Sequence, residues 1–288
     1  MKRFFLLIVG ATIAIALFGR QNNVPNIFTY KVGAIEVSLL SEGQATGNSS
    51  IFIGATPEMV QKAMPEGTYP RSCNAFLVRT QGKNVLVDTG TGRNLIENLQ
   101  LLGLSPEQID AVLITHVHGD HIGGLLKDGK VQFPNAEIYL SKAEHDYSIN
   151  GGDRTTGARN VIEAYKSKLC LFDPKEIDAN PEVVFAGIKA VAAYGHTPGH
   201  TLFMVESGDE KLLIWGDLTH AMAIQMPFPQ VAMTFDVDSE KAIVARKKVL
   251  EFVAEKNITI AGIHNAFPGM GTLTKEPNGG YLYKEVKH

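Results

Sequence analysis

The feature that most constrains this sequence is the segment 115–124, which reads Thr-His-Val-His-Gly-Asp-His-Ile-Gly-Gly. It begins where an apolar, β-branched run ends, so its polar side chains are expected to emerge at the edge of a sheet. Side chains alternate along an extended segment, and His116 and His118 are therefore expected to point the same way. Asp120 and His121 follow on a turn into a short helix. The loop predicts ligands for two neighbouring metal ions, and the alternative is a solvated polar turn.

Three more residues of a metal-ligating type follow apolar runs elsewhere in the chain. They are His196, which precedes a Thr-Pro-Gly turn, Asp217 and His264. Taken singly, each could be a cap or a surface residue. Because all three follow predicted strands, they are expected to gather with the histidine loop on one rim of a sheet.

Apolar runs of strand length recur along the chain, and most are bounded by Gly, Asp or Asn. The predicted strands are 35–40, 75–78, 85–87, 111–115, 137–140, 188–193, 201–205, 211–215 and 259–263, and the predicted helices are 93–102, 158–168 and 239–256. In the last helix, Asp238 is placed to cap the start, and one face carries Ile243, Lys247, Leu250 and Ala254. Strands dispersed among helices favour an α/β layered fold, in one domain over residues 27–288.

Charge and composition exclude several classes of protein. The chain has 27 basic and 30 acidic residues, a formal net charge of −3, whereas a nucleic-acid-binding protein needs a basic face. Its ordinary apolar content excludes a disordered chain, and a polytopic membrane protein is excluded because only one stretch is apolar for long enough to be considered. We therefore expect a globular protein that acts on a small molecule and binds no nucleic acid, and a homodimer stays open.

The first residues are expected to lie outside the fold. Residues 1–19 have a basic start and an uncharged run, the pattern of a secretory signal cleaved near Gly19, with an uncleaved membrane anchor as the alternative. Either predicts a secreted or periplasmic protein, with no stable membrane partner unless the segment is retained. Cys73 and Cys170 could form a disulfide in such a compartment, but two unpaired thiols are an equally good reading.

Taken in order, these motifs resemble the metallo-β-lactamase superfamily of metallohydrolases over nearly the whole chain after the predicted signal. The matching segments are Val-Asp-Thr-Gly at 87–90, the histidine loop, Gly-His-Thr-Pro-Gly-His at 195–200, Asp217 and His264. Three C-terminal segments are most similar to the methyl parathion hydrolase and lactonase–arylesterase group of that superfamily. They are Trp-Gly-Asp-Leu-Thr-His at 215–220, Ala-Arg-Lys-Lys at 245–248 and His-Asn-Ala-Phe-Pro-Gly at 264–269.

The resemblance implies a fold and a metal centre. The fold is an αββα sandwich of two mixed β-sheets flanked by helices, with the site at one edge of the paired sheets. The implied ligands are His116, His118 and His196 for the first ion, Asp120, His121 and His264 for the second, and Asp217 for both. Two divalent ions are expected, with zinc as the first choice because imidazole and carboxylate suit it, and manganese, cobalt or iron as alternatives.

Residues around these ligands are assigned supporting roles. Asp88 is expected to orient a ligand or form a turn, and His200 to support its loop by a hydrogen bond or to replace His196 as a ligand. The expected pocket residues are His220, Tyr147, Tyr165 and Phe267. The histidines read as non-ligands are His145, His220 and His288.

The resemblance further implies a dinuclear metal-dependent hydrolase, in which a hydroxide bridging the metals cleaves an ester, lactone or phosphotriester bond. Asp120 would orient the hydroxide and pass a proton to the leaving group, and Asp217 would bridge the metals. An apolar mouth favouring neutral hydrophobic substrates is expected from Met222, Met226, Pro227, Phe228, Pro229, Met233 and Phe235, unless these residues form core or a dimer interface. Two other functions stay open: a β-lactamase acting on β-lactam amides, and a non-catalytic metal-binding protein.

Overall fold

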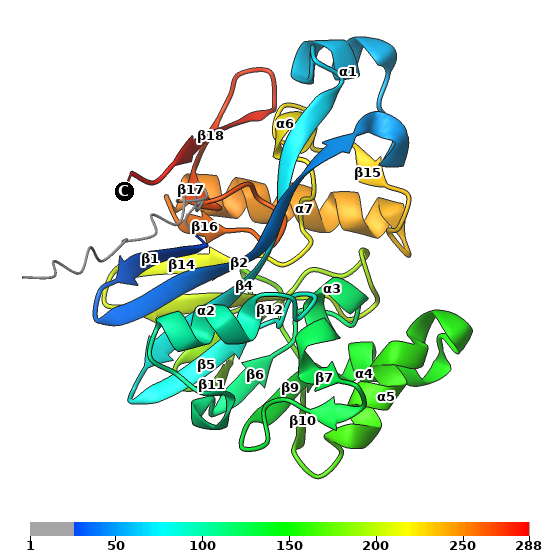
Figure 1. Cartoon of the computed structure of the whole chain (residues 1–288). Helices are drawn as coiled ribbons and strands as arrows, with labels where there is room; N and C mark the ends of the chain where they lie inside the picture. Colours follow the sequence, from blue (N-terminus) through cyan, green and yellow to red (C-terminus); the bar gives the residue numbers. More distant parts are fainter. Residues whose placement is uncertain (1–25, 288) are drawn as a thin grey trace, which may run out of the picture.

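Two seven-stranded sheets form the framework of the structure, a computed structural model that describes residues 26–287 (Figure 1). The first sheet runs in the order β1 (Ile27–Val32), β2 (Ile35–Asn48), β4 (Thr68–Thr80), β5 (Lys83–Val87), β6 (Ala111–Leu113), β9 (Glu137–Ser141) and β10 (Leu169–Phe172). The second runs β11 (Val183–Phe185), β12 (Ile188–Ala192), β13 (Thr201–Ser207), β14 (Glu210–Ile214), β16 (Thr259–Ala261), β17 (Met270–Lys275) and β18 (Tyr281–Glu285). Both sheets mix parallel and antiparallel neighbours.

The period-two alternation of the strands explains why the sheets stack. In β5, Val85 and Val87 face the second sheet, while Leu86 faces the outer helices. In β14, Ile214 likewise points into the layer between the sheets and Leu213 points outward. Each sheet is thus apolar on both faces, and burying both faces requires a partner sheet on one side and helices on the other.

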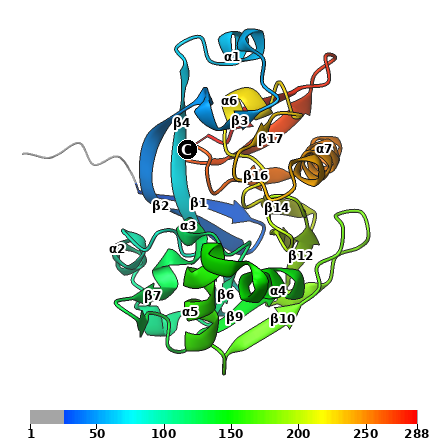
Figure 2. The ribbon, with the colours of Figure 1, turned by 90° about the vertical axis from the view of Figure 1, so that its right-hand side faces the viewer.

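Helices cover the outer faces of the two sheets. On the first sheet lie α2 (Leu95–Leu101), α4 (Lys142–Asn150) and α5 (Thr156–Ala164), and on the second lies α7 (Ser239–Glu255) (Figures 1 and 2). The shorter elements are α1 (Pro57–Ala63), α3 (Gly119–Ile122), α6 (Met222–Gln225), β3 (Phe52–Ile53), β7 (Leu126–Lys127), β8 (Lys130–Val131) and β15 (Ala232–Met233). The predicted αββα sandwich is confirmed.

Every predicted strand and helix corresponds to an observed element, with shifted ends. Asp238 caps α7 by accepting a hydrogen bond from the Lys241 amide. Of the residues predicted to share one face of α7, Leu250 is buried and Lys247 is exposed, and the buried position next to Lys247 is Arg246. The Arg246 guanidinium donates hydrogen bonds to the carbonyls of Leu218, Pro229 and Val231, and these bonds bring a charged residue into the core-facing row.

Residues 221–235 were expected to form an apolar mouth, and most of them form core instead. Met233 is buried on β15, which pairs with β3, and Met226 packs beneath α7. Val231 joins a cluster with Met64 and Tyr69 from the arm formed by β2, β4 and α1. This packing fixes the segment that follows Asp217 against the rest of the fold.

Two predictions concern residues outside the described range, namely the signal at 1–19 and the assignment of His288 as a non-ligand. Within residues 26–287 no helix has the length and apolarity needed to cross a membrane. Cys73 and Cys170 are both free thiols, which matches the unpaired alternative.

Candidate metal centre

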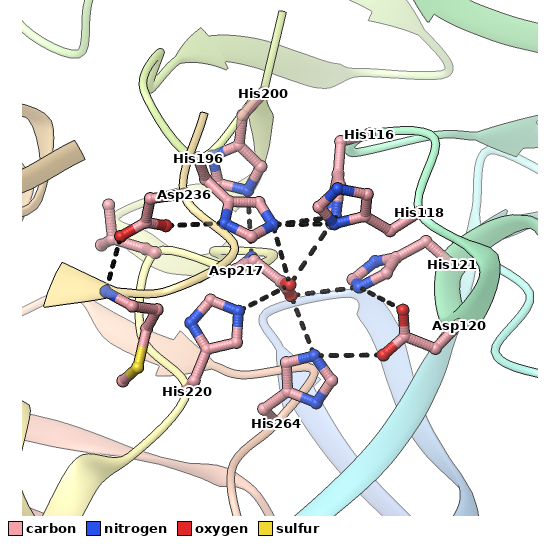
Figure 3. A network of polar contacts seen from close by, with 12 residues as sticks. His116, His118, Asp120, His121, His196, His200, Asp217, His220, Asp236 and His264 are labelled. Atoms are coloured by element: carbon pink, nitrogen blue, oxygen red, sulfur yellow. Dashed lines mark hydrogen bonds and ion pairs between the residues drawn. The ribbon is translucent and has the colours of Figure 1, made fainter. Parts of the chain in front are cut away.

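Seven side chains of metal-ligating type converge at one edge of the paired sheets (Figure 3). Each lies in a segment that directly follows a strand: His116, His118, Asp120 and His121 follow β6, His196 follows β12, Asp217 follows β14 and His264 follows β16. Strands β14 and β16 run parallel, so their following loops meet at the same edge of the second sheet. The convergence therefore follows from the order of strands in the fold.

Three imidazoles and one carboxylate form the first group. The Nε2 atom of His116 lies 2.9 Å from Nδ1 of His118, and Nε2 of His196 lies 3.2 Å and 3.0 Å from those two atoms. The Oδ2 atom of Asp217 is 3.2 Å from Nε2 of His196. Four potential ligand atoms thus face one small volume.

The second group contains Asp120, His121 and His264. Oxygen Oδ2 of Asp120 lies 3.5 Å from Nε2 of His264, and Oδ1 lies 3.9 Å from Nε2 of His121. Asp217 joins this group through its other oxygen, since its Oδ1 is 3.1 Å from His121 Nε2 and 3.2 Å from His264 Nε2. Asp217 therefore stands between the two groups and turns one oxygen toward each.

The chemistry of these donors fits divalent metal ions. Nε2 of His121 and Oδ1 of Asp217 are buried and lie 3.1 Å apart, but within residues 26–287 neither makes a hydrogen bond of normal geometry. Buried polar atoms without a hydrogen bond are rare in folded proteins, and here they indicate a position suited to a metal ion. Imidazole nitrogens packed about 3 Å apart with their lone pairs converging are likewise stabilised by a shared cation. The residues present thus fit a site for metal ions with nitrogen and oxygen ligands.

Hydrogen bonds from the protein orient the ligand imidazoles. Asp88, which adopts a positive φ of 57°, accepts from the Thr115 backbone N–H at 2.8 Å and lies 2.7 Å from Nδ1 of His121. The His264 Nδ1 donates to the Ser72 carbonyl at 3.0 Å. Partners of this type fix the tautomer and the direction of a metal-binding histidine.

His200 contacts the backbone of the segment that carries Asp217. Its Nδ1 donates to the Ala193 carbonyl, and its Nε2 accepts the Asp217 backbone N–H, both at 3.0 Å. Gly216 has a φ of 52°, and a Cβ there would lie 2.6 Å from the His200 ring, so only glycine allows this approach. His200 therefore positions the backbone of Asp217.

Neighbouring charges shift the pKa values of Asp217 and His196 in the metal-free protein. Burial alone would raise the pKa of Asp217, but His121, His264 and His220 outweigh burial and hold that pKa well below its usual value. Burial alone would lower the pKa of His196, but Asp217 and Asp236 raise it to about 9. The carboxylate at the centre is thus anionic and attracts cations.

His220, expected to line the pocket, lies in direct contact with the cluster. Its Nε2 is 2.8 Å from Oδ2 of Asp217, and its ring stacks on that of His264 with centroids 5.1 Å apart. With Asp217 and His264 it forms a further group that could hold a metal ion. The Phe235 ring lies against it, with centroids 4.7 Å apart.

A cleft of about 570 Å³ opens beside His118. It is lined by Val117, His118, Tyr147, Gly151, Arg154, Thr155, Thr234, Phe235, Asp236 and Val237. Tyr147 is therefore a cleft residue, as expected. Of the residues expected from 221–235, Phe235 is the one that reaches the cleft lining, and it is 39% exposed.

Two residues expected at the pocket lie elsewhere. Tyr165 is buried in the outer layer of the first sheet, where its hydroxyl donates to the Leu125 carbonyl and accepts from the Phe133 amide. Phe267 packs edge-on against Phe28 at a centroid distance of 6.4 Å, beside the inter-sheet core. The Tyr165 ring is buried in the core, whereas the half-buried Phe267 ring packs against the core.

The sequence reading missed two buried acids that contact the ligand segments. Asp236 lies 2.8 Å from Nδ1 of His196. Glu144, on α4, accepts hydrogen bonds from the loops that carry the first group of ligands. Each is a single acid far from its partners in sequence, so no local pattern could have identified it.

The comparisons with known proteins agree with this geometry. A family profile described as the metallo-beta-lactamase superfamily matches residues 68–260. AidC, a dizinc quorum-quenching lactonase solved in complex with a product, is 26% identical with a TM-score of 0.83, over 91% of this chain and 98% of its own. AbOPH, a hydrolase in the beta lactamase superfamily, is 25% identical with a TM-score of 0.83, over 92% of this chain and 99% of its own.

Curated relatives match a shorter part of the chain. The anti-Pycsar protein Apyc1 of Bacillus phage vB_BsuM-Goe3 is 27% identical over 161 residues, which make up 50% of this chain and 60% of that protein. The matches to the curated relatives span about half of those proteins' length.

Proposed function

This chain belongs to the metallo-beta-lactamase superfamily, and we propose that it is a dinuclear metal-dependent hydrolase that cleaves an ester or lactone bond in a small, largely apolar molecule. The observation that carries the proposal is the position of Asp217 between two groups of imidazole and carboxylate ligands. The similarity to AidC over most of both chains supports a lactone as substrate. The C-terminal motifs that resemble methyl parathion hydrolase add aryl esters and phosphotriesters to the substrates worth testing.

The metal ligands follow from the two groups. His116, His118 and His196 would hold one ion, Asp120, His121 and His264 the other, and Asp217 both. Zinc is proposed first because the donors are imidazole nitrogens and carboxylate oxygens. When bound, such ions supply Lewis acidity and lower the pKa of water toward neutrality.

The protein's own groups supply the remaining chemistry. The Asp120 side chain is 40% exposed, and it is the outermost carboxylate of the second group. Burial would raise its pKa, but His121 and His264 hold the pKa below its usual value, so Asp120 is ionised and can accept a proton and return it to a leaving group. Phe235 and Val237 provide an apolar part of the cleft lining. Tyr147 and Arg154 line the same cleft and offer polar contacts to the substrate.

The test is a kinetic panel on metal-reconstituted protein with aryl esters, γ- and δ-lactones, phosphotriesters and a β-lactam. We expect two metal equivalents per chain and ester or lactone hydrolysis. Asp217→Ala and His118→Ala should each lose at least about a hundredfold in activity, because removing a ligand costs more than removing its support. His145→Ala is the matched control, since this histidine lies on α4 at the surface and contacts Asp146.

Several outcomes would contradict the proposal. Full activity in a metal-free preparation would exclude a metal-dependent mechanism. Cleavage of the β-lactam alone would make the chain a β-lactamase. Two bound metal equivalents with no hydrolysis of any substrate would instead indicate a metal-binding protein.

We also propose that the protein works outside the cytoplasm, from the signal-like pattern at residues 1–19. Fractionation of cells that express the full chain, with mass spectrometry of its N-terminus, tests this. Recovery of the intact chain in the cytoplasmic fraction would contradict it.

A further inference from the structure

Glu144 is a buried acid on α4 that lies outside the set of metal ligands. It stands in the first turn of that helix and is 0% exposed. Burying a carboxylate costs free energy unless hydrogen-bond donors surround it. The donors around Glu144 therefore show which parts of the chain this carboxylate connects.

Within residues 26–287, every hydrogen bond that its carboxylate accepts comes from the two segments that carry the first ligand group. Its Oε1 accepts the Val117 backbone N–H at 3.0 Å, and Val117 stands between His116 and His118. Its Oε2 accepts the Thr197 hydroxyl at 2.7 Å and the Gly199 backbone N–H at 2.9 Å, just after His196. One carboxylate therefore joins two loops that are about 80 residues apart in the chain.

The first turn of α4 packs closely against the loop that follows His196. Ser141 caps the helix by accepting from the Glu144 N–H, and its hydroxyl donates to the Gly199 carbonyl at 2.8 Å. A Cβ on Gly199 would lie 2.2 Å from the Glu144 nitrogen, so only glycine fits there. The backbone, and not only a side-chain rotamer, thus places the Glu144 carboxylate.

We propose that Glu144 is a positioning residue for the metal centre, which joins the His116–His118 loop to the His196 turn and so sets the spacing of the three imidazoles before metal binds. This inference rests on the proposed metal-dependent function. Preorganised ligands bind metal more tightly, because the loops do not have to be ordered at the moment of binding.

The competing interpretation is that Glu144 only stabilises the fold. A second buried acid in the chain provides a matched control. Glu42 is 2% exposed and accepts hydrogen bonds from the Thr91 hydroxyl and the Arg93 and Asn94 amides. It holds a loop just as Glu144 does, but that loop carries none of the proposed ligands.

The experiment compares Glu144→Gln with Glu42→Gln in the full chain. The amide keeps one acceptor oxygen but turns an NH₂ group toward donors, so both variants lose part of a similar network. The measurements are the melting temperature of the metal-free protein, the zinc affinity by competition with a chromophoric chelator, and the visible spectrum of the cobalt form. We expect Glu144→Gln to bind zinc about 10- to 100-fold more weakly and to change the cobalt spectrum, with Glu42→Gln matching the wild type in both.

Thr197→Val covers the case in which Glu144→Gln does not fold. It removes one hydrogen bond to Glu144 at nearly constant volume, and it should weaken zinc binding in the same direction by a smaller factor. Wild-type affinity in the folded Glu144→Gln protein, or in Thr197→Val if that variant alone folds, overturns the inference while the proposed function stands. Equal losses in Glu144→Gln and Glu42→Gln overturn it as well. A wild-type chain that binds no zinc overturns both the inference and the proposed function.

Discussion

The Nδ1 nitrogen of His196 lies 2.8 Å from Oδ1 of Asp236, a carboxylate that comes forty residues later in the chain (Figure 3). The other oxygen of Asp236 accepts the Met233 backbone N–H at 2.9 Å, so the carboxylate is held on both sides. Its side chain is fully buried. This contact fixes the ring of His196 with Nε2 directed at Asp217.

We therefore expect Asp236→Asn to weaken metal binding. The amide cannot accept from both the imidazole and the Met233 amide, so the His196 ring loses its fixed orientation. Loss of such an outer partner lowers metal affinity by about 10- to 100-fold. Chelator competition measures the change. Asp238→Asn is the control, because the Asp238 carboxylate caps α7 by accepting from the Lys241 amide. Equal affinities in the wild type and Asp236→Asn would contradict the assigned role.

The buried His200 predicts a loss of stability in acid for the metal-free protein. Burial, and secondarily His196, lower the pKa of His200 from 6.5 to about 3. As the pH falls below 6.5, the unfolded chain takes up a proton that the folded chain refuses, so the free energy of unfolding decreases down to about pH 3. His200→Asn should reduce this slope by up to about 1.4 kcal/mol per pH unit.

Urea unfolding at several pH values between 4 and 7 measures that slope. His145→Asn serves as the control, since His145 is partly exposed. If neither His200→Asn nor the control changes the pH dependence of the free energy of unfolding, the fold does not hold His200 neutral.

Phe235 is expected to contribute to substrate binding. Its ring is 39% exposed, lines the cleft and lies 5.9 Å from the ring of His196 between centroids. Phe235→Ala removes apolar contact area worth about 1–2 kcal/mol, so KM for an apolar aryl ester should rise roughly 5- to 30-fold with kcat less affected. Tyr194→Ala is the control, because Tyr194 is 38% exposed but lines a different groove. A fall in kcat at constant KM would assign Phe235 to the chemical step instead.

Arg246 is expected to stabilise the segment that follows Asp217. It is 1% exposed and donates to three backbone carbonyls. Arg246→Met leaves these buried acceptors without donors and should cost about 2–4 kcal/mol in the free energy of unfolding. Lys247→Met, at the exposed neighbouring position, should change it by less than about 0.5 kcal/mol. Denaturant unfolding of the metal-free proteins distinguishes the two, and equal effects would contradict the buried role of Arg246.

Local pattern was sufficient for much of the architecture. Runs such as 85–87 and 211–215 alternate between the two faces of a sheet, and this alternation depends only on neighbouring residues. In the two seven-stranded sheets, the edge strands β1, β10, β11 and β18 and the interior strand β17 were not predicted. Edge strands are more exposed and carry fewer buried apolar residues, as in β18, where Tyr281 is the one buried residue of the strand.

The sequence by itself determined the residue types of the metal centre, because His116, His118, Asp120 and His121 lie within one loop whose spacing already sets their direction. Only the tertiary structure decided that Asp217 turns one oxygen toward each ligand group, and that Glu144 and Asp236 hold the loops around it. It also placed Tyr165 in the core and packed Phe267 against the core. The physical reason is that periodicity acts between neighbours in the chain, whereas a buried carboxylate finds its donors only after distant strands and helices have packed together.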